Sequence, residues 1–264
     1  MNITLKLPVH YWETVKDLLI SHGFTPIRKD YTLWALEKKG QYVHLYPSGI
    51  LLIQGKDPQG LKEFILGSLP EEKVYRVGCD ESGKGDFFGP IVFSCVLVKP
   101  ENYKRLWELS PKDSKDIKEE EVFRKAELLR PVVDVFTEVL EPKEFNRLYR
   151  EHRNLNTLMT ITYRKLISSI KELLKDKEHT IVIDGYRLRS PFDGGVIFEP
   201  DAERHYPEVA SASIFARESL LRWLKERNLP KGSSSQAKIK ALEIYHKDRR
   251  LAEELLKISF LESK

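Results

Sequence analysis

Short apolar segments rich in β-branched residues place the tightest limit on how this chain of 264 residues can fold. The segments with this pattern, which is typical of buried strands, are residues 74–77, 91–98, 132–138 and 180–183. Helical periodicity separates or follows them, over residues 142–150, 156–174, 209–225 and 235–257. Strands that alternate with helices and are then followed by helices predict an α/β domain, in which helices flank a mixed sheet.

The first part of the chain predicts a smaller, separate module. Its pattern is a strand, a helix, four strand-like segments and a closing helix, over residues 3–7, 9–21, 25–27, 31–37, 42–46, 51–54 and 61–69. Turn residues at 39–40 and 47–49 separate the later strands at hairpin distances, so we expect an antiparallel sheet with helices on one face. The polar, proline-containing stretch 68–72 is the expected linker. We therefore predict an α+β domain at residues 1–69 and a larger domain at residues 70–264.

Composition sets limits on location and partners. A net charge of +4 and a pI near 8.8 are compatible with a polyanionic partner. No apolar run approaches the roughly 20 residues of a membrane-spanning helix, and the first residues do not resemble a secretory signal, so a cytoplasmic protein is expected. Cys79 and Cys95 lie in apolar segments without the spacing of metal ligands, and we expect two buried thiols rather than a zinc site or a disulfide framework.

Two adjacent carboxylates, Asp80 and Glu81, follow the first apolar segment of the larger domain. The ordinary interpretation is a charged turn between two strands. A phosphate-binding loop is a second interpretation, because Gly78 and Gly83-Lys84 nearly match GxxxxGK[ST]. It fails because Gly85 replaces the required hydroxyl residue and because the two carboxylates would repel phosphate. Since Mg²⁺ prefers oxygen ligands, we interpret the pair as part of a metal site.

Further carboxylates are expected to join this pair. Asp184 follows an apolar strand directly, at the carboxyl end where open α/β sheets place their sites. A fourth acid is expected before the helix that begins near residue 209, where Glu203 and Asp201 both qualify and Glu199 is a weaker candidate. Such a set suits an in-line phosphoryl displacement between two ions about 4 Å apart.

Residues 80–90, with the sequence Asp-Glu-Ser-Gly-Lys-Gly-Asp-Phe-Phe-Gly-Pro, resemble the signature of the type 2 ribonucleases H. Ser82 and Lys84 resemble ribonuclease HIII more than ribonuclease HII, which usually has Val and Arg at these places. Residues 112–115, 183–185 and 209–217 resemble three further motifs, in the order in which the family has them.

The resemblance implies a ribonuclease H fold with an N-terminal domain similar to half of a TATA-box-binding protein. It implies a monomeric endonuclease that uses Mg²⁺ or Mn²⁺ to cut the RNA strand of an RNA/DNA hybrid, leaving 5′-phosphate and 3′-hydroxyl ends. Carried over residue by residue, the catalytic metal ligands are Asp80, Glu81 and Asp184. Glu203 is the implied fourth catalytic acid, where the family usually has Asp, and Asp201 remains an alternative.

The resemblance also implies substrate-binding residues. They are Gly83, Lys84 and Gly85, which resemble the loop that reads the RNA strand, together with Ser114 and Lys115. Basic residues expected to bind the hybrid from the N-terminal domain are Lys6, Arg28, Lys29, Lys38, Lys39 or Lys56. Tyr31, Trp34, Tyr42 and Tyr46 offer flat contacts, although we expect at least half of them in the core.

Two other classes of protein remain open from the sequence. One is a non-catalytic nucleic-acid-binding protein, which the acidic cluster opposes because bare carboxylates repel phosphates. The other is a metal-dependent nuclease of related fold that acts on DNA, such as a recombinase or a junction resolvase.

Overall fold

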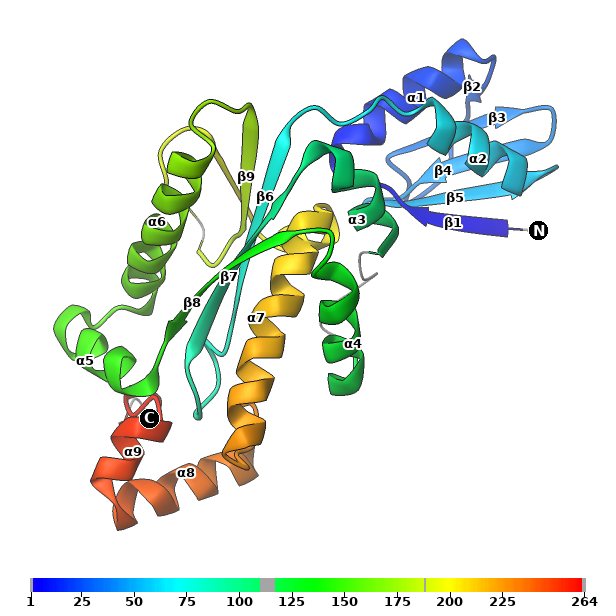
Figure 1. The fold of residues 1–264 in the computed structure, drawn as a ribbon. Helices are drawn as coiled ribbons and strands as arrows, with labels where there is room; N and C mark the ends of the chain where they lie inside the picture. The colour runs from blue at the N-terminus through cyan, green and yellow to red at the C-terminus, as the bar shows by residue number, and fades with distance from the viewer. Residues whose placement is uncertain (1, 110–116, 188, 263–264) are drawn as a thin grey trace. The chain divides into compact units, whose positions relative to one another are not determined.

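The structure is a computed structural model that describes residues 2–109, 117–187 and 189–262 (Figure 1). Its contacts divide the chain into two compact units, residues 1–72 with 204–207, and residues 73–203 with 208–264. Each unit has its own five-stranded sheet. The chain therefore leaves the second unit after residue 203 and returns to it at residue 208, a detour that no feature of the sequence indicates.

The first unit is an antiparallel sheet with the strand order β1-β5-β4-β3-β2. Its elements are β1 (Asn2–Lys6), a 3-10 turn (Val9–Tyr11), α1 (Trp12–Ser21), β2 (Thr25–Pro26), β3 (Trp34–Lys38), β4 (Gln41–Leu45), β5 (Ile50–Gly55) and α2 (Pro58–Ser68). The expected strands and helices are all present. The likeness of this unit to half of a TATA-box-binding protein stays a prediction.

Local chemistry explains why α2 begins earlier than its apolar pattern predicts. Asp57 caps the helix, since its side chain accepts a hydrogen bond from the backbone N–H of Gly60 at 3.0 Å. Pro58 occupies the first turn, where a missing N–H costs nothing.

The two helices of the first unit cover one face of its sheet (Figure 1). Val43 and Leu45 of β4 are fully buried, whereas Tyr42, on the opposite face by strand alternation, is 39% exposed. Trp34 is a core residue, 9% exposed. The sheet thus has one packed face and one face without helices.

The second unit contains the mixed sheet expected from the sequence, with the strand order β10-β9-β6-β7-β8. Strands β6, β7 and β8 pair antiparallel, while β9 pairs parallel with both β6 and β10. The strands are β6 (Tyr75–Ser82), β7 (Ile91–Val98), β8 (Asp134–Leu140), β9 (His179–Asp184) and β10 (Val196–Glu199). The predicted fold class, a mixed sheet flanked by helices, is confirmed.

The helices of the second unit lie on both faces of this sheet (Figure 1). They are α3 (Tyr103–Leu109), α4 (Glu119–Leu129), α5 (Pro142–His152), α6 (Leu155–Leu173), α7 (Pro207–Glu226), α8 (Ser235–Lys247), α9 (Arg249–Leu255) and α10 (Ser259–Glu262), with 3-10 turns at Pro100–Asn102 and Ala202–Arg204. The sequence reading omitted α3 and α4. It also treated residues 235–257 as one helix, which Asp248 divides by capping α9 through the N–H groups of Arg250 and Leu251.

Each face of the sheet has its own core. On one face Val77 and Phe93 pack with residues of α6, among them Tyr163. On the other face Val92 packs with Leu220 and neighbouring residues of α7. Helix α7 approaches β6 so closely that a Cβ on Gly78 would lie 2.2 Å from the backbone carbon of Glu208.

The expectation of two buried thiols is wrong in one respect. Cys79 and Cys95 are fully buried, but a disulfide joins them. They face each other directly in the register of β6 and β7, with 4.1 Å between their Cα atoms. The pairing depends on the strand register, which the spacing of the two residues along the chain does not reveal.

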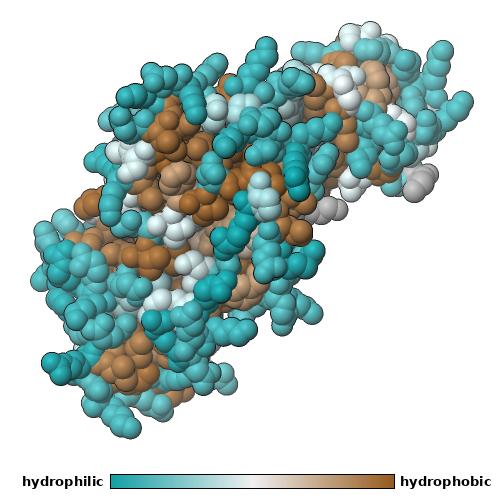
Figure 2. Space-filling model, in the orientation of Figure 1, coloured by the Kyte–Doolittle hydropathy of each residue, from teal (hydrophilic) through white to brown (hydrophobic). Residues whose placement is uncertain are grey.

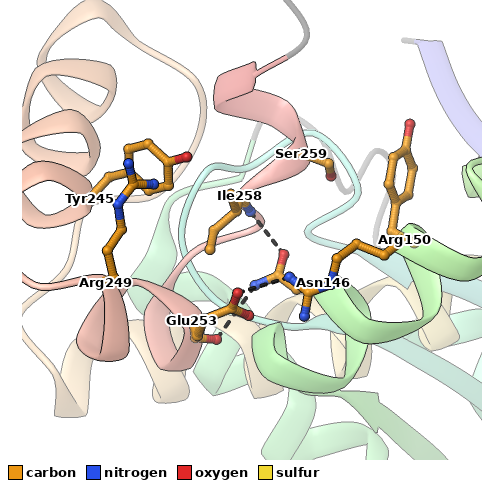
Figure 3. Close-up of a pocket in the computed structure, with 8 residues that line it drawn as sticks. Asn146, Arg150, Tyr245, Arg249, Glu253, Ile258 and Ser259 are labelled. Carbon is orange, nitrogen blue, oxygen red and sulfur yellow. Dashed lines mark hydrogen bonds and ion pairs between the residues drawn. The ribbon is translucent and has the colours of Figure 1, made fainter.

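A buried asparagine and a buried lysine hold the segment between α9 and α10. The Asn146 side chain on α5 accepts from the N–H of Ile258 at 2.9 Å (Figure 3). It also donates to the carbonyl of Leu256 at 2.8 Å. Lys257, fully buried, donates to the backbone carbonyls of Phe88 and Gly89. The C-terminal segment is therefore tied both to α5 and to the turn that follows β6.

Hydrophilic side chains cover much of the face in Figure 2, with hydrophobic groups visible among them. Within the described residues, none of the helices combines the length and the apolar character that crossing a membrane requires.

Candidate active site

Four carboxylates of the second unit line one pocket of about 340 Å³. They are Asp80, Glu81, Asp184 and Glu203, the four acids selected from the sequence. The pocket is also lined by Ser82, Lys84, Ser213, Arg217 and Lys231.

Strand β6 continues through the adjacent acids instead of ending before them. Asp80 pairs with Ser94, Glu81 with Phe93 and Ser82 with Val92, so antiparallel pairing with β7 keeps this segment extended. Residues 80–82 are therefore part of a strand, and neither a turn nor a phosphate-binding loop forms there. Successive side chains of a strand point to opposite faces of its sheet. The two neighbouring carboxylates therefore have different surroundings.

Asp80 and Asp184 point to the face of the sheet that α7 covers. In the parallel register of β6 and β9, Cys79 lies beside Ile183, so the residues that follow these two are neighbours on the same face. Ser213 of α7 forms a hydrogen bond with the carboxylate of Asp80. Asp80 also accepts a hydrogen bond from the N–H of Glu81 at 2.7 Å.

Glu81 points to the opposite face, toward α6. The Tyr163 hydroxyl donates to its Oε2 at 2.5 Å, and the Lys84 ammonium donates to its Oε1 at 2.7 Å. Its side chain is only 2% exposed. Both oxygens of this carboxylate are therefore held by donors from within the chain.

Asp184 fixes the short turn that carries the fourth acid. Its Oδ1 accepts the N–H of Ala202 at 2.8 Å, at the start of the turn Ala202–Arg204. Glu203 is 8% exposed and lines the pocket, whereas Asp201 is exposed, has a φ of 57° and does not line it. Of the two candidates for the fourth acid, the structure brings Glu203 to the pocket.

Burial and the neighbouring acids raise the proton affinity of Asp80. Burial raises the pKa of Asp80 well above its usual value, and the charges of Glu81, Asp184 and Glu203 raise it further, against the hydrogen bond from Ser213. Burial lowers the pKa of Lys84, but Glu81, Asp80 and Asp184 reverse this and the pKa is raised overall. The pocket is thus a site of concentrated negative charge that a cation stabilises.

The donor set fits divalent cations that bind between protein and substrate. Among the described residues, no three His, Cys, Asp or Glu side chains are gathered as a ligand set for one ion, and Asp80, Glu81 and Asp184 accept internal hydrogen bonds instead. Mg²⁺ commonly binds through one or two carboxylates, with phosphate oxygens and water completing its shell. Four acids around one pocket are sufficient for two such ions.

Comparison with known proteins identifies the family. A sequence model of the family described as Ribonuclease HII matches residues 77–261. Ribonuclease HIII of Aquifex aeolicus (strain VF5) is 41% identical over 252 residues, which cover 93% of this chain and 96% of the relative. The chain belongs to the ribonuclease HIII family, within the type 2 ribonucleases H.

Solved structures agree with this assignment. The crystal structure of Aquifex aeolicus RNase H3 superposes on this chain with a TM-score of 0.63 and 39% sequence identity. The superposition covers 98% of this chain and 100% of the relative. Bst-RNase HIII, solved in complex with Mn²⁺, shares the fold with a TM-score of 0.68 at 22% identity. Ribonuclease HIII enzymes are ribonucleases H, so the chain is a ribonuclease H, a class that acts on RNA/DNA hybrids.

The expected substrate loop of the ribonuclease HIII signature begins where β6 ends. Gly83 has a φ of 95°, and a Cβ there would lie 2.3 Å from the carbonyl oxygen of Pro90, so this position requires glycine. Gly85 has open space around it. Ser114 and Lys115 lie outside the described residues.

Three residues that line the pocket, and one that lies behind it, were not assigned from the sequence. Tyr163 reaches Glu81 from a helix 82 residues away along the chain, and no local pattern marks it. Ser213 and Arg217 lie in the motif at 209–217, whose alignment with the family was noted without roles for these side chains. Lys231 lies in a segment that was read only as a break between helices.

Proposed function

We propose that this ribonuclease H hydrolyses the RNA strand of an RNA/DNA hybrid by a metal-dependent mechanism that leaves 5′-phosphate and 3′-hydroxyl ends. The observation that carries the proposal is the convergence of Asp80, Glu81, Asp184 and Glu203 on one pocket. Mg²⁺ or Mn²⁺ is the proposed cofactor, and the Mn²⁺ complex of Bst-RNase HIII supports the use of a divalent ion.

In this mechanism Asp80, Glu81 and Asp184 would hold the ions, and Glu203 would assist the second ion or the release of product. Divalent ions supply the activation of water and the stabilisation of charge on the leaving oxygen. Tyr163 and Ser213 orient the carboxylates of Glu81 and Asp80 through their hydrogen bonds. The water oxygen bonds to phosphorus as the bond to the 3′-oxygen breaks, and that oxygen takes up a proton to become the 3′-hydroxyl group.

Substrate binding is assigned to two parts of the chain. Gly83, Lys84 and Gly85 are the proposed contacts to the RNA strand beside the pocket, together with Ser114 and Lys115. Residues 1–69 are the proposed hybrid-binding domain, through the face of its sheet that lacks helices. Lys6 and Lys38 are weaker candidates than the other basic residues, because their ammonium groups donate to the carbonyls of Ser48 and His22. A cytoplasmic monomer is part of the same proposal.

The decisive experiment compares cleavage of labelled RNA/DNA hybrid, duplex DNA and duplex RNA by the intact protein, with Mg²⁺, with Mn²⁺ and with EDTA. We expect cleavage of the RNA strand of the hybrid only, and only with a divalent ion. Asp80→Asn and Glu203→Gln should lose most of this activity.

Asp201→Asn is the matched control, since it removes a nearby acid that does not line the pocket. Full activity of Asp80→Asn, or cleavage in EDTA, would remove the mechanism. Equal cleavage of duplex DNA would instead indicate a DNA nuclease of related fold.

A further inference from the structure

The pocket has cations as well as acids on its wall. Lys84 and Arg217 are two of them, and each has an internal acceptor: Lys84 pairs with Glu81, and Arg217 donates to the carbonyl of Ile117 at 3.0 Å. Lys231 lines the same pocket and makes no hydrogen bond or ion pair with any residue that the structure describes. Its ammonium is thus available to a ligand.

The surroundings of Lys231 favour an anion. Partial burial lowers the pKa of Lys231, and the positive charge of Arg217 lowers it further, while Asp86 and Glu119 oppose this without reversing it. Two cations on one pocket wall repel each other, and an anion bound beside both removes that repulsion. Asp86 and Glu119 act on Lys231 only through their charge, since neither forms an ion pair with it within the part of the chain that the structure describes.

The loop that carries Lys231 is tied to the turn that follows β6. Gly232 accepts a hydrogen bond from the N–H of Phe87 at 3.4 Å, and Gly89, two residues further on, donates to the carbonyl of Leu255 at 2.9 Å. The first of these bonds ties the residue after Lys231 to the turn that begins with Gly83 and Lys84, and both lysines line the same pocket. A strand of nucleic acid held at that turn therefore passes within reach of the Lys231 loop.

We propose that Lys231 binds a backbone phosphate of the nucleic acid next to the one that is cut. This inference rests on the proposed function, because it takes the hybrid as the occupant of the pocket. A phosphate is the anion that such a substrate presents at regular intervals, and a lysine binds it without regard to sequence. Lys231 thereby offsets the repulsion between the strand and the four carboxylates.

The test measures binding and cleavage with the full-length protein. Binding of a fluorescent RNA/DNA hybrid is followed in EDTA, from about 50 to about 200 mM salt, where counterion release dominates the affinity. The variants are Lys231→Gln, Lys231→Arg as the charge-conserving rescue, and Lys247→Gln as the matched loss of one exposed lysine on α8, outside the pocket. Steady-state cleavage with Mg²⁺ gives KM and kcat for each.

We expect Lys231→Gln to weaken binding about two- to tenfold at low salt. KM should rise by a similar factor with kcat nearly unchanged. The slope of log Kd against the logarithm of the salt concentration should fall by about 1, the value for loss of one phosphate contact. Lys231→Arg should restore both the affinity and the slope, and Lys247→Gln should resemble the wild type.

A Lys231→Gln variant with the slope of the wild type would overturn the proposal. The proposal would also be overturned if Lys231→Gln lowered kcat and changed the affinity for Mg²⁺ while KM stayed the same. Lys231 would then act on the carboxylates and not on the strand. These outcomes differ from failure of the proposed function, in which the wild-type protein itself does not cleave the hybrid.

Discussion

At the residue scale, the environment of Glu81 illustrates how a buried acid is held in place at the pocket. Its two oxygens accept hydrogen bonds from Tyr163, in the core, and from Lys84, whose side chain is half exposed. Tyr163 is itself fully buried and stacks on Tyr186, with 5.7 Å between the ring centroids. Because Tyr163 is held by the core, it fixes one oxygen of Glu81, whereas the flexible Lys84 side chain is able to release the other.

Tyr163→Phe should therefore reduce activity without unfolding the protein. It removes the hydroxyl that orients Glu81 but keeps the ring in the core, and loss of such an orienting partner typically lowers activity or metal affinity by about 10- to 100-fold. The measurements are kcat on the hybrid and the Mg²⁺ concentration for half-maximal rate.

Tyr186→Phe is the control for this substitution. It also removes a tyrosine hydroxyl, one that is partly buried and bonds the Thr160 hydroxyl at 2.8 Å, but it leaves the hydrogen bonds of Glu81 in place. Equal effects of the two substitutions would show that Tyr163 acts only through packing.

At the element scale, the close approach of β6 and α7 brings Asp80 next to Ser213. Gly78 permits the approach, because a Cβ at this position would lie 2.3 Å from the backbone nitrogen of Val209. Such an overlap involves only backbone atoms, so no side chain can rotate to relieve it. The position of α7 against the sheet, and with it one wall of the pocket, depends on this glycine.

Gly78→Ala should destabilise the protein by about 3 kcal/mol or more, since the helix must shift away from the strand. Chemical denaturation of the purified variant measures the loss. Gly85→Ala is the control, because nothing lies within 4 Å of a Cβ there, and its stability should change by less than about 0.5 kcal/mol. A stable Gly78→Ala variant would mean that α7 is not held against β6.

The C-terminal segment contributes a second element-scale effect through Lys257. Burial lowers the pKa of Lys257 from 10.5 to about 7, although Asp86 favours the charged form. Between these two values the unfolded chain binds one more proton than the folded chain, so this lysine makes stability rise with pH across that window. Below pH 7 both states carry the proton and the contribution is constant.

Lys257→Met removes this dependence. The stability of the wild type relative to the variant should rise from about pH 7 toward pH 10, on the order of 1 kcal/mol per pH unit at most. The variant also loses the hydrogen bonds to Phe88 and Gly89, which lowers its free energy of unfolding by an amount that does not depend on pH. Denaturation curves must therefore be measured at several pH values. Lys247→Met is the control for loss of an exposed lysine, and a difference that does not vary with pH would contradict the assignment.

At the scale of the whole molecule, the two units divide the proposed work between cutting and holding the hybrid. The division is not a simple cut in the chain, because residues 204–207 belong to the first unit. The N–H of Val9 donates to the carbonyl of His205 at 3.3 Å, two residues from Glu203. Removing residues 1–69 would therefore also disturb the chain beside the fourth acid, and single substitutions are the cleaner test of hybrid binding.

Tyr42→Ala should raise KM for the hybrid by about two- to tenfold while kcat stays the same, because the exposed ring lies on the helix-free face of the first sheet. Ile20→Ala is the matched control on α1, with 40% exposure against 39% for Tyr42. Steady-state kinetics on one hybrid compare the two, and an unchanged KM for Tyr42→Ala would argue against binding at this face.

Much of this protein was determined by local sequence. Strand and helix periodicity placed most elements of both units, since burial on one face imposes a regular pattern on the residues. The four acids that line the pocket were predicted because carboxylates after apolar strands, and a signature shared with a known family, are readable without a fold. The helices α3 and α4 were overlooked, although the buried residues Val122, Ala126 and Leu129 have helical spacing.

Only the tertiary structure decided the features that join distant segments. The disulfide depends on the register of β6 and β7, the choice of Glu203 over Asp201 depends on the turn that Asp184 holds, and the hydroxyl of Tyr163 reaches Glu81 from another helix. These contacts form between residues far apart along the chain, and the free energy that selects them comes from packing of the whole unit. No local pattern encodes that packing, so the identity of the acids was readable from the sequence but their partners were not.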